Sequence, residues 1–91
     1  MKILWLPSAA RNRREQILFI AQDKPSAALK QNTLIESRVR LLAQFPELGT
    51  YNPKADSYRL VINRTRFIVS YRIRGNRIEI FRFLHGKQKP L

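Results

Sequence analysis

The spacing of apolar residues changes once along this chain, and that change limits the possible folds more than any other feature. Between residues 9 and 44, apolar residues recur every three or four positions, as on one side of a helix. From residue 58 onward, β-branched and aromatic residues are enriched and alternate with polar ones, as in strands. Helices followed by a run of strands predict an α+β fold.

Two helices are expected in the first half of the chain. The first is predicted over residues 9–22, where Ile17 and Ile20 share one face, and the second over residues 26–44. The apolar stripe of the second helix consists of Ala28, Ile35, Val39 and Leu42. Because only a short connection separates the helices, we expect them to form an antiparallel hairpin.

The strands are expected on both sides of this hairpin. They are "KILWL" at residues 2–6, "YRLVI" at 58–62, "RFIVSYRI" at 66–73 and "RIEIFRFL" at 77–84, with a loop over residues 46–57. Gly75 and Asn76 form a two-residue turn between the last two strands. The sequence predicts one domain over residues 1–91 with the order β-α-α-β-β-β, an antiparallel sheet and the helical hairpin packed on one face.

Alternation along the last two strands assigns their side chains to the two faces of the sheet. On the earlier strand, the expected core residues are Phe67, Val69, Tyr71 and Ile73. On the final strand, one face should carry Arg77, Glu79, Phe81, Phe83 and His85, and the other Ile78, Ile80, Arg82 and Leu84. Since neither face of the final strand is fully polar, we expect this strand to be central.

The face without helices is expected to carry basic side chains. Arg59, Arg72, Arg74 and the C-terminal tail are the candidates for lining it. The alternative for each arginine is a solvated charge or an ion pair with Glu79, Glu36 or Glu15.

The charge of the chain predicts an anionic partner. The sequence has 18 Lys and Arg against 6 Asp and Glu, a net charge of +12. Such an excess attracts either a nucleic acid backbone or an acidic protein segment. Absence of cysteine excludes disulfide and thiolate chemistry. The apolar run near the start is too short for a signal peptide or a membrane span, so we expect a cytoplasmic protein without a membrane partner.

His85 is the single histidine and the one side chain whose ordinary pKa suits acid–base chemistry near neutral pH. The alternative is a hydrogen-bonded structural role at the end of a strand. With one histidine and few carboxylates, no metal site is expected. The sequence also has no glycine-rich phosphate loop and no nucleophile motif, so no cofactor is predicted.

Four segments in this order, "LWLPSA", "FPELG", "YRLVINRTRFIVSYRI" and "IEIFRFLHGKQ", resemble the RelE/ParE superfamily of bacterial toxins. The resemblance spans nearly the whole chain and favours the ParE-like members. It implies the toxin of a type II toxin–antitoxin module, neutralised by an acidic cognate antitoxin.

Two activities are implied by this resemblance. RelE-like members cut mRNA on the ribosome, and most of their catalytic positions are not matched here: Arg59 is followed by Val61, the next arginine position is Ile68, and the C-terminal one falls near Lys87 before the sequence ends without the tyrosine. ParE-like members poison DNA gyrase, and their ending in a strand, a histidine and a basic tail is similar to this one.

The gyrase interpretation is preferred, and two alternatives stay open. For a gyrase poison, the predicted target-binding residues are Arg59, Arg72, Arg74, His85, Lys87, Gln88 and Lys89. A ribonuclease could instead use a catalytic set of His85, Arg72 and Lys87, acting on ribosome-bound mRNA. A non-toxic basic module that binds nucleic acid is the third class.

Overall fold

The computed structural model describes residues 1–86 of the chain. Its elements are β1 (Lys2–Trp5), α1 (Pro7–Asp23), α2 (Pro25–Arg40), the 3-10 turn η1 (Leu41–Ala43), β2 (Thr50–Asn52), β3 (Ser57–Val61), β4 (Phe67–Arg74) and β5 (Arg77–His85). The predicted α+β class is confirmed, as is the order of β1, the two helices and the final three strands. Lys2, Gln88 and the rest of the sequence-predicted tail differ in this respect, because residues 87–91 lie outside the described part.

The five strands form one sheet in the order β1-β5-β4-β3-β2. Strands β2 to β5 pair antiparallel, but β1 pairs parallel to β5, so the sheet is mixed and the predicted all-antiparallel sheet is wrong in this pairing. A parallel pair needs a long crossover, which the helices and the other strands supply. Strand β2 lies in the segment predicted as a loop, and the expected central position of β5 is correct.

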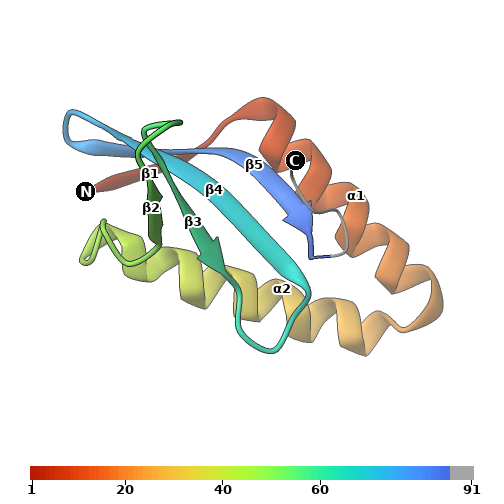
Figure 1. Ribbon diagram of the computed structural model, residues 1–91. Coiled ribbons are helices and arrows are strands. Elements are labelled where there is room, and N and C mark those ends of the chain that lie inside the picture. Colours follow the sequence, from red (N-terminus) through yellow and green to blue (C-terminus); the bar gives the residue numbers. More distant parts are fainter. Residues whose placement is uncertain (87–91) are drawn as a thin grey trace.

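Both helices begin with a proline in the first turn, where the missing N–H costs no helical hydrogen bond. Pro7 starts α1 two residues before the predicted boundary, and Pro25 starts α2 directly after the single linking residue Lys24. The hairpin lies against one face of the sheet (Figure 1). Within residues 1–86, no helix has both the length and the apolar composition that crossing a membrane requires.

The core lies between the helical hairpin and one face of the sheet. The predicted stripe of α2 is buried, with Ile35 and Leu42 fully shielded from solvent. The predicted core face of β4 is buried as well, apart from partly exposed Ile73. The core cluster consists of Ala9, Ile35, Val39, Leu42, Leu60, Ile62, Phe67, Val69, Tyr71, Ile78, Ile80 and Phe83.

A β-bulge in β5 interrupts the strict alternation that the sequence predicted. Ser70 pairs with Arg82, whereas the next residue Tyr71 pairs with Ile80, so Phe81 is an extra residue on β5. A bulge of this kind moves every later side chain to the other face. Phe83 is therefore buried and Arg82 exposed, which corrects the predicted faces of the second half of β5.

Truncating the α2 stripe should destabilise the protein strongly. Ile35→Ala or Leu42→Ala is expected to lower the free energy of unfolding by about 2–5 kcal/mol, because each removes a fully buried side chain. Leu29→Ala on the same helix is the control: its side chain is 72% exposed, and a change within about 0.5 kcal/mol is expected. Denaturant titration measures all three, and equal losses would contradict the assigned face of α2.

Candidate functional site

The sheet face opposite the helices is uncovered in the described part of the chain, and we call it the open face (Figure 1). Pairing register places Arg72 beside Glu79, Arg74 beside Arg77, and Arg59 in one row with Ser70 and Arg82. Lys2 joins this face from β1, where it pairs with Arg77. The basic side chains of the open face are Lys2, Arg59, Arg72, Arg74, Arg77 and Arg82.

Glu79 is the acidic residue at the centre of the open face, and it is only 7% exposed. Its Oε1 accepts a hydrogen bond from Arg72 Nε at 2.9 Å, and its Oε2 lies 2.9 Å from Arg77 Nη2. The bond from Arg72 and the positive charges of Arg77 and Arg74 lower the pKa of the Glu79 carboxyl, against the opposing effect of burial. Glu79 is therefore held as a carboxylate with both oxygens engaged.

Arg72 is held from two sides. Besides its bond to Glu79, its guanidinium carbon lies 5.2 Å from the centroid of the Phe81 ring. The bulge that inserts Phe81 thus brings an aromatic ring onto the open face, where it contacts a cation. The ion pair with Glu79, which was the structural alternative for Arg72, is present, and it positions this side chain. By contrast, Arg59 and Arg74 form no ion pair with another described residue.

The predicted site residues separate into two groups. Arg59, Arg72 and Arg74 share the open face, as predicted. His85 pairs with the core residue Phe67 and contacts it ring to ring, edge on, at 5.7 Å between centroids. His85 and Arg72 therefore lie on opposite faces of the sheet, and the structure does not bring them together. Lys87, Gln88 and Lys89 lie outside the described residues.

His85 lines a cavity of about 480 Å³ at the open end of the helical hairpin. The polar and charged side chains around it are Gln16, Gln31, Arg64, Thr65, Arg66 and His85, and its apolar ones are Phe19, Ile20 and Phe67. Arg64 and Arg66 belong to the turn between β3 and β4. Sequence reasoning assigned these residues to a turn only, although two arginines in one turn were the signal that could have found them.

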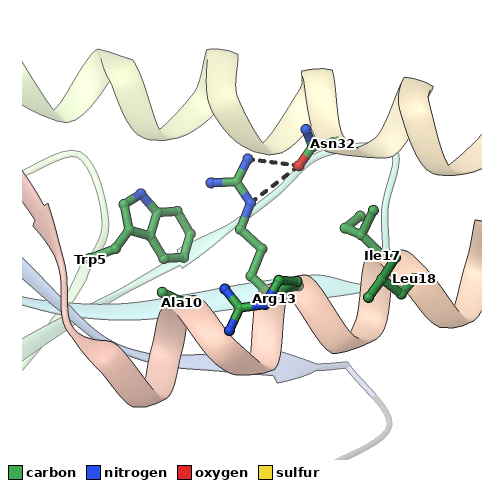
Figure 2. A pocket seen from close by; sticks show the side chains of 7 residues that line it. Trp5, Ala10, Arg13, Ile17, Leu18 and Asn32 are labelled. Atoms are coloured by element: carbon green, nitrogen blue, oxygen red, sulfur yellow. Dashed lines mark hydrogen bonds between the residues drawn. The ribbon is translucent and has the colours of Figure 1, made fainter.

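Arg13 connects the two helices to β1, as Figure 2 shows. Its Nη2 donates to Asn32 Oδ1 at 2.7 Å, its Nη1 lies 2.8 Å from Glu36 Oε1, and its guanidinium carbon lies 4.7 Å from the Trp5 ring centroid. A groove of about 330 Å³ lies beside it, with Leu18 among its lining residues. The many contacts of Arg13 indicate a structural role, because its charge and its stem are both used within the fold.

The comparisons with known proteins agree with this geometry. The chain belongs to the ParE toxin family: the profile described as "ParE toxin of type II toxin-antitoxin system, parDE" matches residues 3–90. Among solved structures, a chain from "Chromosomal ParDE TA system from P. aeruginosa" is similar to it, with 25% identity and a TM-score of 0.81 over 93% of this chain and 95% of that chain. No curated protein matches. The predicted membership of the RelE/ParE superfamily, nearer to ParE, is confirmed.

Replacing Glu79 with Gln should make stability less dependent on pH. Because the folded pKa of Glu79 lies below its ordinary 4.5, the carboxylate stabilises the fold above about pH 4.5, and this stabilisation is lost as the pH falls through the folded pKa. The melting temperature of the parent should exceed that of Glu79→Gln near pH 6, and the gap should narrow towards about pH 3.

Calorimetry across this pH range measures that gap. Glu15→Gln, at an exposed position of α1, is the control and should leave the melting temperature nearly unchanged at every pH. A gap for Glu79→Gln that stays constant down to the lowest pH would contradict the assigned role of the carboxylate.

Proposed function

We propose that this protein is the toxin of a type II toxin–antitoxin module and that it poisons DNA gyrase. The observation that carries this proposal is the composition of the open face, where basic side chains surround one carboxylate that is already neutralised. Arg59, Arg74 and Arg82 are exposed there. Such a face favours a broad electrostatic contact with a protein surface or with the DNA that gyrase holds.

The ribonuclease alternative has less support in the arrangement of the described residues. Cleavage at a ribose 2′-OH needs one group that takes a proton and another that returns it. Arginine stays protonated, and both oxygens of Glu79 are bonded to guanidinium groups. His85, the candidate acid or base, lies on the opposite face from Arg72. A target-binding role for Arg59, Arg72 and Arg74 agrees better with this geometry.

An acidic antitoxin is the second partner we propose. The net charge of +12 calls for a polyanionic partner, and the similar solved structure is titled as a ParDE toxin–antitoxin system. An acidic segment that covers the exposed arginines of the open face would both neutralise their charge and exclude the target. Toxin, antitoxin and gyrase would then meet in the cytoplasm.

The target contact is expected to weaken in steps. Arg59→Gln, Arg74→Gln and Arg82→Gln, alone and combined, should each reduce gyrase-dependent plasmid cleavage and growth arrest, because the contact is spread over many charges. Arg40→Gln removes an equal charge from an exposed position on α2 and serves as the control. His85→Ala should have only a modest effect. Codon-phased mRNA cuts with intact DNA, abolished by His85→Ala, would contradict the gyrase proposal.

Binding of the antitoxin should depend on salt through its association rate. Raising NaCl from about 0.05 to 0.5 M should slow association markedly and change dissociation little, because screening reduces steering between distant charges. Stopped-flow mixing of the toxin with the antitoxin measures both rates. An association rate that does not respond to salt would contradict a charge-steered partner, as would a native operon without an antitoxin gene.

A further inference from the structure

The cavity beside His85 has the composition of a site for an anionic ligand. Arg64, Arg66 and His85 contribute basic groups to it, and no carboxylate is among its lining residues. Arg64 and Arg66 take part in none of the ion pairs of residues 1–86, so neither guanidinium is neutralised within the described fold. Planar guanidinium groups bind phosphate through paired hydrogen bonds.

The turn that carries these two arginines is held in place from both sides. The Thr65 hydroxyl donates to the Ile62 carbonyl oxygen at 2.8 Å and accepts from the Phe67 N–H at 3.0 Å. The Gly86 N–H donates to the Arg66 carbonyl oxygen, which ties the turn to the end of β5. A binding site whose backbone is already ordered loses less entropy when the ligand binds.

Arg64 itself adopts a left-handed backbone conformation, with φ of 68°. An arginine at such a position is less favourable than glycine or asparagine, which turns of this kind usually carry there. Its presence is explained if the guanidinium contributes something that a glycine could not, and the adjoining cavity is where it would act.

The opposite wall of the cavity supplies groups that suit a nucleobase. Phe19, on α1, is 72% exposed and lines the cavity. Aromatic rings at such positions stack against bases of any sequence. Gln16 and Gln31 bring side-chain amides from the two helices, and each amide can donate and accept at a base edge. A volume of about 480 Å³ lies within the usual range for small-ligand pockets.

We propose that this cavity binds a nucleotide, with its phosphate between Arg64 and Arg66 and its base against Phe19. His85 adds a further polar group at the same end of the cavity. The site lies on the helical side of the sheet, away from the open face, and the proposal therefore does not depend on which target the toxin attacks. The nucleotide is either free or one unit of a single-stranded nucleic acid, since both present the same phosphate and base.

The test is an NMR titration of the purified protein with thymidine 5′-monophosphate, inorganic phosphate, thymidine and a short thymidine oligonucleotide. Resonances of His85, Phe19 and the turn at residues 63–66 should shift with the monophosphate. Weaker binding of phosphate alone and of thymidine alone is expected, because each lacks one half of the ligand. Tighter binding of the oligonucleotide would identify nucleic acid as the source, and equal binding a free nucleotide.

Matched variants separate a built site from general attraction to a basic protein. Arg64→Gln with Arg66→Gln should weaken monophosphate binding by about tenfold or more, because both phosphate contacts are lost. Arg11→Gln with Arg40→Gln removes the same charge from exposed positions that do not line the cavity, and a change below about twofold is expected. Equal losses in the two double variants would overturn the proposal.

Two further variants test the base contact and the ordered turn. Phe19→Ala should weaken binding of the monophosphate by about fivefold or more and leave inorganic phosphate unchanged. A β-carbon on Gly86 would lie 3.0 Å from the Arg66 carbonyl oxygen, so Gly86→Ala should shift the turn and weaken binding without changing the charge. Phosphate binding as tight as the monophosphate, with no effect of Phe19→Ala, would overturn the nucleotide assignment.

Discussion

The chain has only two helices with which to cover a five-stranded sheet, and this shortage of covering surface governs the rest of the molecule. The hairpin buries one face, where its stripe with Ile35 and Leu42 packs on the sheet. The other face stays in contact with water, and a chain of this size has no further layer to place there. Side chains on the open face must therefore be polar or charged, which is where the excess of arginine becomes accessible.

Two of the acidic residues organise this excess. Glu79 engages Arg72 and Arg77 on the open face, and Glu36 engages Arg13 between the helices. In both places an aromatic ring lies near the same guanidinium, so charge and stem are both accommodated. The remaining open-face arginines have no such partner within the described residues, and they are the charges that an external anion can neutralise.

The sheet separates two surfaces that differ in shape and chemistry. The open face is broad and basic, and it suits a macromolecular partner of the kind a ParE toxin would meet. The cavity near His85 is concave and combines arginine, amide and aromatic side chains, and it suits a small phosphate-bearing ligand. Because the two lie on opposite faces, substitutions in one can be made without touching the contacts of the other.

Local spacing in the sequence determined the helical hairpin, the last three strands, the buried stripe of α2 and the shared face of Arg59, Arg72 and Arg74, because period and strand alternation depend only on neighbouring residues. Tertiary structure alone decided the parallel pairing of β1, the short strand β2 and the bulge at Phe81. It also decided that His85 meets two arginines of a distant turn instead of Arg72. Strand direction, an inserted residue and the meeting of distant segments are set by pairing across the sheet, which no local pattern encodes.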